Sequence, residues 1–316
     1  MMEQLRLFSE LKDAKRILLA GAGGGFDVFC GLPLFFALKR MGHEVFLANM
    51  SFSNLSFAEG RRFGSCIVEI SADSSGSKSY FPEKYLCQWF EARGEPQSIF
   101  GIEATGLLPL RDAYQVLAEH LELDAMVLVD GGTDSLMRGD ETELGTPAED
   151  ILSIGAVHAV EVPIKALLCL GFGVDSFHGI CHAHFLEAVA ALAHKGAFWG
   201  VFSVLKEMPE AQLYHEATEF VFAKMPNRMS IVNASILSAI QGDYGDVHRT
   251  QRTAGSQLYI NPLMSMYWSF QLDAVAERLL YLDLLKDTHN FYEVISRIDG
   301  FRKSLSEIKP YKHIPV

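Results

Sequence analysis

Short apolar runs alternate with amphipathic stretches through the first two thirds of the chain. An apolar run of strand length between turn residues is typical of a strand that is buried on both faces. Amphipathic repeats predict helices at 27–41 and 111–121. Strands interleaved with helices favour a parallel sheet covered on both sides. We therefore predict an α/β fold with an open, mostly parallel, doubly wound sheet, whose strands are residues 16–20, 44–48, 66–70, 125–130, 167–171 and 197–204.

The pattern changes near residue 209, where helical repeats begin to dominate. The apolar and aromatic segment 261–270 is expected to pack onto the sheet. No linker-like composition separates the two parts, so we predict one domain over residues 1–316, with 209–316 as a mainly helical continuation. The helices predicted there are 209–224, 230–240, 272–285 and 291–308.

Composition and charge narrow the class of protein. Of the 316 residues 49% are hydrophobic, and 39 Asp and Glu against 27 Lys and Arg give a net charge of -12, which argues against a general nucleic-acid binder. No apolar stretch approaches the roughly 18 residues of a membrane helix. Residues 1–14 predict an amphipathic helix rather than a signal peptide, and 71–79 a loop. The five scattered cysteines lack a C-x-x-C motif, as expected for reduced thiols in a cytoplasmic protein.

Three predicted strands end in a glycine-rich turn that leads to an aspartate. Gly is common in tight turns and Asp often caps helices, so one such turn alone would mean little. Since the carboxyl ends of parallel strands share one edge of a sheet, we expect Asp27, Asp134 and Asp175 to converge on one site. The turns contain Gly21, Gly23, Gly24 and Gly25 in the first, Gly131, Gly132 and Thr133 in the second, and Gly171 and Gly173 in the third.

The first turn invites a dinucleotide-binding interpretation, G-x-G-x-x-G, but meets it only in part. Gly21 and Gly23 fit, whereas Phe26 stands at the third glycine. The second strand ends at Asn49, where such folds offer an acid to a ribose. No Gly-Lys-Ser/Thr follows either, so the P-loop is excluded.

Consecutive glycine amides at a helix N-terminus can nevertheless bind a phosphate. Asp27 beside them would then cap the helix, bind a ribose hydroxyl or amine, or hold a divalent cation that bridges to phosphate. A hard cation such as Mg²⁺ suits carboxylate ligands. We take Asp27, Asp134 and Asp175 as candidate metal ligands, and the glycines of the first two turns with Thr133 as a candidate phosphate cradle.

The second and third turns continue into further ionisable residues. Asp130, Asp134, Asp140 and Glu141 form an acidic group that would be a solvated loop or part of the site, and Thr146-Pro147 predicts a helix start. His178 and His182 are four residues apart and would share a face of one helix. An acid–base role for His178 is favoured over a metal-binding pair. The candidate catalytic residues are Asp134, Asp175 and His178.

One stretch of this acidic chain is both basic and rich in hydroxyls. Arg249, Arg252, Thr253 and Ser256 can clamp a phosphate or carboxylate, although a polar surface loop would look similar. We include them among the candidate ligand-binding residues.

The motifs G-A-G-G-G-F-D-V, D-G-G-T-D-S and N-A-S…G-D-Y-G-D-V-H-R-T…I-N-P-L-M-S-M-Y-W occur together in this chain. As a set they resemble a microbial family catalogued as domain of unknown function 1152, from about Arg16 to about Arg278. The resemblance implies a Rossmann-like α/β fold. It implies no activity and no catalytic assignment.

Three functions fit these observations. The first is an enzyme that acts on a small phosphorylated or nucleotide-like ligand, by metal-assisted phosphoryl or nucleotidyl transfer or by hydrolysis. The second is a non-catalytic binding or sensor protein, and the third a nicotinamide- or flavin-dependent oxidoreductase. Tyr267, Trp268 and Phe270 fit either a core contact or a dimer interface, so a homo-oligomer stays open.

Overall fold

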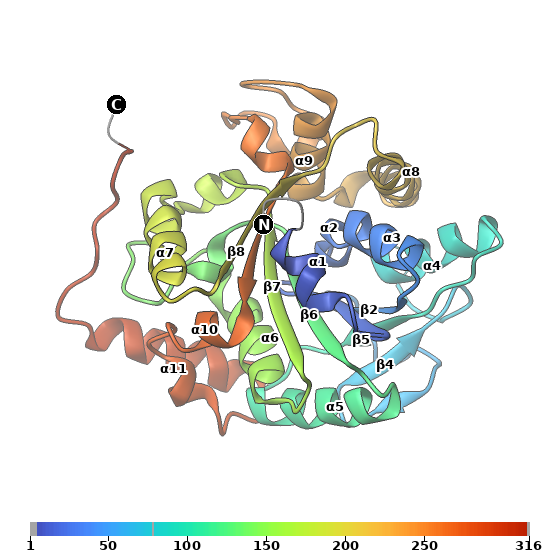
Figure 1. The fold of residues 1–316 in the computed structure, drawn as a ribbon, viewed down its shortest axis with the longest axis horizontal. Coiled ribbons are helices and arrows are strands. Elements are labelled where there is room, and N and C mark those ends of the chain that lie inside the picture. Colours follow the sequence, from blue (N-terminus) through green and yellow to red (C-terminus); the bar gives the residue numbers. More distant parts are fainter. Residues whose placement is uncertain (1–4, 78, 315–316) are drawn as a thin grey trace.

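A nine-stranded open sheet runs between two layers of helices (Figure 1). The structure is a computed structural model and describes residues 5–77 and 79–314. The strands stand in the order β3-β4-β5-β2-β1-β6-β7-β9-β8. Their bounds are β1 (Arg16–Gly21), β2 (Glu44–Met50), β3 (Arg62–Phe63), β4 (Ile67–Ile70), β5 (Ile99–Ile102), β6 (Ala125–Asp130), β7 (Ile164–Leu170), β8 (Phe198–Ser203) and β9 (Met266–Gln271).

The five central strands, β5, β2, β1, β6 and β7, are parallel, which confirms the predicted α/β class. Counted along the chain they stand in the order 3-2-1-4-5, so the winding reverses between β1 and β6. Ligands of open α/β sheets bind outside the carboxyl ends of the strands at such a reversal. Strands β4 and β9 run against their neighbours, which makes the sheet mixed.

The aromatic segment 261–270 does not simply pack onto the sheet. Its second half is strand β9, which lies between β7 and β8 and pairs antiparallel with both. Tyr267 and Phe270 are buried there, so they form core contacts. Trp268 stacks between Phe172 and Phe198 at 5.9 and 6.2 Å between ring centroids.

The sheet separates two hydrophobic cores, one on each face. Alternate residues of β1 show this, since Ile17 and Leu19 face one core and Leu18 and Ala20 the other. The first core is covered by α1 (Arg6–Leu11), α2 (Asp27–Cys30), α3 (Leu32–Arg40), α4 (Pro82–Ala92), α8 (Pro209–Lys224) and α9 (Ile231–Gln241). The second is covered by α5 (Leu107–His120), α6 (Pro147–Ala159), α7 (His182–His194), α10 (Leu272–Ala276) and α11 (Phe291–Ser304).

The helix predicted at 27–41 is interrupted at Gly31, which separates α2 from α3. A side chain at Gly31 would overlap Leu19 of β1, so the helix passes close to the sheet here. The amide of Gly31 bonds Val28 O at 3.1 Å, in a tighter turn than an α-helix makes.

The helix predicted at 272–285 is also shorter than expected. It ends at Ala276, and only a 3₁₀ turn at Leu282–Leu285 follows. In between, Leu280 N donates to Arg138 O at 2.9 Å, so the chain there is bound to the segment after β6 instead of to its own helix.

The part after residue 209 covers both faces of the sheet. Helices α8 and α9 lie on one side, whereas α10 and α11 lie on the other (Figure 1). The last described residues run from α11 past α7, where Lys309 Nζ pairs with Glu187 Oε1 at 2.6 Å.

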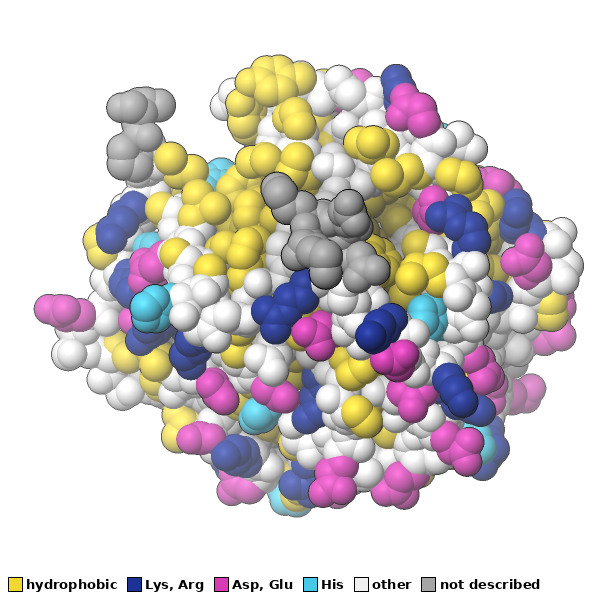
Figure 2. Space-filling view, in the orientation of Figure 1, with side chains coloured by type: hydrophobic (Ala, Val, Ile, Leu, Met, Phe, Trp, Pro, Cys, Tyr) yellow, Lys and Arg dark blue, Asp and Glu magenta, His cyan; other side chains and the backbone are white. Residues whose placement is uncertain are grey.

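The distribution of charged side chains, the state of the cysteines and the length of the helices agree with the predictions from the composition. Figure 2 shows acidic and basic side chains mixed over the lower half of this face, with hydrophobic side chains gathered toward the top. All five cysteines are free and buried. Among the described helices none has the length and apolar character needed to cross a membrane. Of the predicted segments 1–14 and 71–79, residues 1–4 and 78 lie outside the described residues.

Candidate cation and ligand site

Five aspartates converge at the carboxyl ends of β1, β6 and β7. They come from five different places: Asp27 begins α2, Asp130 ends β6, Asp134 follows β6, Asp150 lies in the first turn of α6, and Asp175 follows β7. We call them the carboxylate cluster. All except the half-buried Asp27 are at most 7% exposed. In the described part of the chain no Lys or Arg pairs with any of the five.

Backbone amides bind three of these carboxylates, two from the glycine-rich turns after β1 and β6 and one from Thr146, just before α6. These amides therefore bind anionic side chains of the protein itself. The hydrogen bonds are Gly23 N to Asp27 Oδ2 at 2.8 Å, Thr133 N to Asp175 Oδ2 at 2.6 Å and Thr146 N to Asp134 Oδ2 at 2.8 Å.

Two glycines, Gly132 in the turn after β6 and Gly145 just before α6, leave room for the carboxylates. A Cβ on Gly132 would overlap Asp175, and a Cβ on Gly145 would overlap Asp134. Gly145 also has φ +69°, which a residue with a side chain rarely adopts. Of the predicted phosphate cradle, only Gly24 and Gly25 line the cavity described below, whereas Gly21, Gly23, Gly131, Gly132 and Thr133 do not.

One trio within the cluster has the geometry of a cation site. Asp27, Asp130 and Asp150 each offer an oxygen, and these oxygens lie within 4.8 Å of one another. Both carboxylate oxygens of Asp150 are buried and have no hydrogen-bond partner among the described residues. The predicted ligands Asp134 and Asp175 lie beside the trio with one oxygen each bound to a turn amide.

Sequence reasoning did not single out Asp150 as a ligand, because it follows no strand and resembles an ordinary acidic residue in the first turn of a helix. The available signal was Thr146-Pro147, which marks where α6 begins. α6 does begin at Pro147, although the Thr146 hydroxyl donates to Asp134 Oδ2 at 3.1 Å instead of capping the helix.

Burial raises the pKa of every carboxyl in the cluster, and repulsion from Asp134 raises the pKa of the other four further. Burial and the nearby Asp134 raise the pKa of Asp27 to about 7, against the opposing hydrogen bond from Gly23. Burial also raises the pKa of Asp134, and this effect is opposed by its hydrogen bonds to Thr146 and by positive charge on His178. A bound divalent cation would reverse these shifts, since it stabilises the ionised carboxylates.

A cavity of about 610 Å³ opens beside Asp27, and we call it the first cavity. It combines an acidic residue, two arginines, an imidazole and aromatic rings. Phe52 and Phe177 are 59% and 62% exposed, so each ring presents apolar surface to a ligand in the cavity. The lining residues are Gly24, Gly25, Phe26, Asp27, Phe52, Tyr80, Phe177, His178, Arg228, Ser230, Ile231, Val232 and Arg252.

The predicted basic stretch divides into two groups. Arg252 lines the first cavity and Arg249 a neighbouring one. Thr253 and Ser256 instead hold the backbone, since Thr253 Oγ1 donates to Thr250 O at 3.0 Å and Ser256 Oγ to Thr253 O at 2.7 Å. Arg228, which also lines the first cavity, was not predicted because it belongs to no motif or charge cluster in the sequence.

His178 and His182 do not share a helix, so the expectation of a common helical face was wrong. His178 ends a 3₁₀ turn and His182 begins α7, with Gly179 at φ +81° between them. His178 lines the first cavity. His182 packs on Phe172 at 5.0 Å between ring centroids, and burial lowers its pKa.

The side chain of Asn49 holds the first glycine-rich turn in place through hydrogen bonds. Its Nδ2 donates to Gly25 O and to Glu83 Oε1, both at 2.8 Å, and its Oδ1 accepts from Val28 N at 3.2 Å. Burial raises the pKa of Glu83 to about 7. Where a dinucleotide fold would offer an acid to a ribose, this chain therefore uses an amide to hold the turn.

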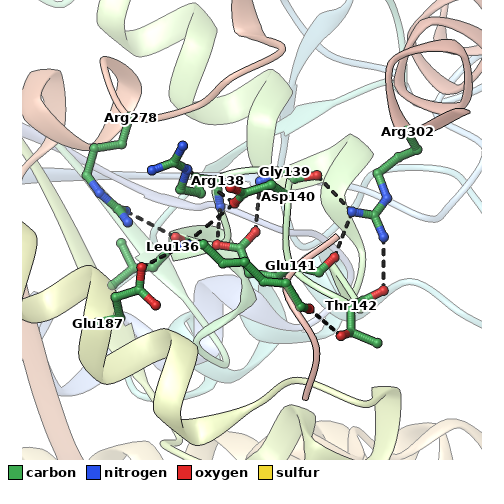
Figure 3. Close-up of polar contacts among 10 residues, drawn as sticks. Leu136, Arg138, Gly139, Asp140, Glu141, Thr142, Glu187, Arg278 and Arg302 are labelled. Atoms are coloured by element: carbon green, nitrogen blue, oxygen red, sulfur yellow. Dashed lines mark hydrogen bonds and ion pairs between the residues drawn. The ribbon is translucent and has the colours of Figure 1, made fainter. Parts of the chain in front are cut away.

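Residues near the C-terminus hold the segment 136–142, which links Asp134 to the start of α6 (Figure 3). Arg302 donates to three carbonyl oxygens of this segment, and Arg278 Nη1 donates to Leu136 O at 3.2 Å. We call these contacts the C-terminal clamp. The Arg302 bonds run to Gly139 O at 2.8 Å, Glu141 O at 2.6 Å and Thr142 O at 2.9 Å.

Asp140 and Glu141, which could have formed a solvated loop, belong to this segment. Glu141 is buried and accepts from Arg138 N at 3.1 Å and Gly139 N at 2.9 Å (Figure 3). Asp140 pairs with Arg138 Nε at 3.2 Å. They stabilise the loop and do not line the first cavity.

A family model described as a protein of unknown function, DUF1152, matches residues 18–302. The chain belongs to the DUF1152 family. The match reaches further toward the C-terminus than the resemblance noted from the motifs, and it includes the clamp residue Arg302. No curated protein and no solved structure matches the chain. All five carboxylates of the cluster lie within the DUF1152 match, as do the residues that line the first cavity.

Proposed function

We propose that this DUF1152 protein is an enzyme that acts on a small phosphorylated, nucleotide-like molecule with a divalent cation such as Mg²⁺. The reaction class is phosphoryl or nucleotidyl transfer, or hydrolysis. The observation that carries the proposal is Asp150, a buried carboxylate that faces Asp27 and Asp130 and has no hydrogen-bond partner among the described residues. A buried carboxylate is stable in ionised form only beside a positive charge or hydrogen-bond donors, and for Asp150 the described residues supply neither.

The proposed roles follow from position. Asp27, Asp130 and Asp150 would hold the cation, and Asp27 places it at the edge of the first cavity. The cation would supply Lewis-acid stabilisation of a phosphoryl oxygen. Arg228, Arg252 and the turn at Gly24–Gly25 would bind the phosphate.

The remaining groups would position the ligand and move protons. Phe52 and Phe177 would stack on a base, and His178 would act as general acid or base. Asp134 and Asp175 would hold the turns in place. The strand order of the parallel core is that of dinucleotide-binding sheets, which supports a Rossmann-like placement of the ligand at the reversal between β1 and β6.

One observation favours the non-catalytic sensor as the second candidate. Asp134 and Asp175, the carboxylates predicted to be catalytic, are bound to backbone amides and do not line the first cavity. The same cavity could then bind a ligand without converting it. An oxidoreductase gains little support, because Asn49 is engaged with Gly25 and Glu83 and is not available to a ribose.

Cation titration by calorimetry tests the central part of this proposal. We expect Asp150→Asn to weaken Mn²⁺ or Mg²⁺ binding at least tenfold, because it removes an anionic ligand without changing size. Asp299→Asn, an exposed acid on α11, is the matched control and should change nothing. Equal cation affinity in wild type and Asp150→Asn would refute the cation site.

A panel of nucleotides and sugar phosphates, each with and without Mg²⁺, separates enzyme from sensor. An enzyme forms product from at least one compound, and His178→Ala abolishes turnover while the compound still binds. If the protein is a sensor, wild type and His178→Ala both bind the compound and neither forms product.

A further inference from the structure

A second cavity, of about 630 Å³, adjoins the first and shares Arg252 with it. Its lining includes Arg249, His248, Thr250 and Asn227 but no Asp or Glu. It therefore differs from the first cavity, where Asp27 opposes the arginines.

Arginines around the two cavities lack carboxylate partners. In the described chain, the side chains of Arg228 and Arg249 form no ion pair or hydrogen bond. Arg252 donates one bond, from Nη1 to Met229 O at 2.7 Å. The protein has 39 acidic against 27 basic residues, so partners are plentiful. Three neighbouring arginines that remain unpaired in such a chain are suited to an external anion.

We propose that the second cavity is a subsite for a second anionic group of the same ligand. This inference rests on the proposed function and extends it, because it specifies a nucleotide-like ligand with two separate anionic groups. The first group would lie beside Gly24, Gly25 and Arg228, and the second beside Arg249. Arg252 stands in the shared wall. A guanidinium has five N–H donors, and most of those on Arg252 remain free to bind anions on either side.

The two subsites differ in their need for a cation. Asp27 repels an anion in the first cavity unless a divalent cation neutralises it. The described residues that line the second cavity include no carboxylate, although Asp246 accepts from Nε2 of the lining residue His248 at 3.0 Å. Binding in the second cavity is thus independent of Mg²⁺, whereas binding in the first is strengthened by Mg²⁺.

Tungstate, a phosphate analogue that needs no fitting base, tests this inference in crystals of the full chain. We expect density beside Arg249 with or without Mg²⁺, and beside Gly24 and Gly25 with Mg²⁺. Arg249→Ala should remove only the second anion, while Arg111→Ala, an exposed arginine on α5, should remove neither. Absence of tungstate beside Arg249 would overturn the inference. Tungstate beside Arg249 but not in the first cavity with Mg²⁺ would instead count against the proposed function alone.

Solution affinities provide the second readout. Adenosine 3′,5′-bisphosphate should bind about tenfold more tightly than AMP, as expected for one added charge-assisted contact. Arg249→Ala should remove this advantage and leave AMP binding within about twofold. Equal weakening of both compounds by Arg249→Ala would refute a separate second subsite.

Discussion

The glycine-rich turns after β1 and after β6 share a sequence pattern but have different surroundings. The first turn opens onto a cavity through Gly24 and Gly25. The second turn is enclosed, and the segment after it is held by the C-terminal clamp. The comparison shows that a Gly-rich turn with an aspartate marks a place where a carboxylate meets backbone amides. Whether a ligand also binds there depends on what packs over the turn.

Three glycines with nearly equal φ angles test this difference, because Gly25 lies in the first turn, Gly145 lies against Asp134 in the segment that follows the second turn, and Gly196 lies in neither region. Gly145, Gly25 and Gly196 have φ of +69°, +64° and +70°. Alanine at Gly145 should destabilise the protein most, by about 3 kcal/mol, because the methyl group also displaces Asp134. Thermal or urea unfolding measures the effect.

The other two glycines serve as controls. A methyl group at Gly196 meets nothing within 4 Å, so Gly196→Ala should cost only the backbone term of about 1 kcal/mol. Gly25→Ala contacts the movable side chains of Tyr80 and Phe52, so its cost in stability should lie between the other two, with weakened ligand binding in addition. Equal losses at all three positions would contradict the distinction between the open first turn and the packed segment that follows the second turn.

Loss of the clamp should have the next largest effect. Arg302→Ala leaves three carbonyl oxygens without their donor and should lower the free energy of unfolding by about 2 kcal/mol. Because segment 136–142 connects Asp134 to α6, cation affinity should fall as well. Calorimetry with Mn²⁺ measures this, and Lys303→Ala, an exposed neighbour, is the control. Lost stability with unchanged cation affinity would mean that the clamp does not position the cluster.

The patterns that succeeded were local ones. Strand β6 and helix α8 begin and end at the predicted residues, because charged residues or Pro209 bound their apolar patterns. The antiparallel insertion of β9 was missed, since it depends on pairing with β7 and β8 over more than sixty residues of sequence separation. Strand β5 was also missed, because Ile99–Ile102 is short and contains a glycine.

In the candidate site, too, residues marked by a local pattern were predicted and residues placed by long-range packing were missed. Asp27, Asp134 and Asp175 were predicted because each follows a strand, and strand ends share an edge. Asp150 approaches the same point from a helix, and Arg228 from a turn between α8 and α9, so neither carries a repeating pattern. Such residues are found only when the packing of α6 and α9 against the strand ends is known.

The carboxylate cluster should make stability depend on pH in a direction opposite to ordinary acid denaturation. Without a cation, the folded protein binds more protons than the unfolded chain, because burial raises the pKa of Asp27 to about 7 and that of Asp150 well above its usual range. The free energy of unfolding should therefore fall as pH rises from about 5 to 8, by about 2 kcal/mol.

Mg²⁺ should remove most of this fall, since it binds the ionised form. Asp150→Asn should reduce the fall without Mg²⁺ and also abolish the rescue. Unfolding curves across the pH range, with and without Mg²⁺, provide the measurement. A pH profile that Mg²⁺ leaves unchanged would contradict cation binding by the cluster.

The smallest expected effect lies behind the first turn, at Glu83. Burial raises the pKa of this carboxyl from 4.5 to about 7, so its contribution to stability is present at low pH and is lost as pH rises through about 7. Glu83→Gln keeps an oxygen that can accept from Asn49 Nδ2 and removes the titration. The variant should match wild type near pH 5 and be more stable by roughly 1–2 kcal/mol at pH 8.

Because Glu83 lies outside the carboxylate cluster, this gain should be the same with and without Mg²⁺. Urea unfolding at both pH values, in each condition, measures it. Asn49→Ala is the contrasting variant, since it removes the bonds to Gly25 and Val28 and should destabilise the first turn at every pH. If the gain in stability of Glu83→Gln vanishes with Mg²⁺, Glu83 interacts electrostatically with the cation. Glu83 and the carboxylate cluster would then belong to one site.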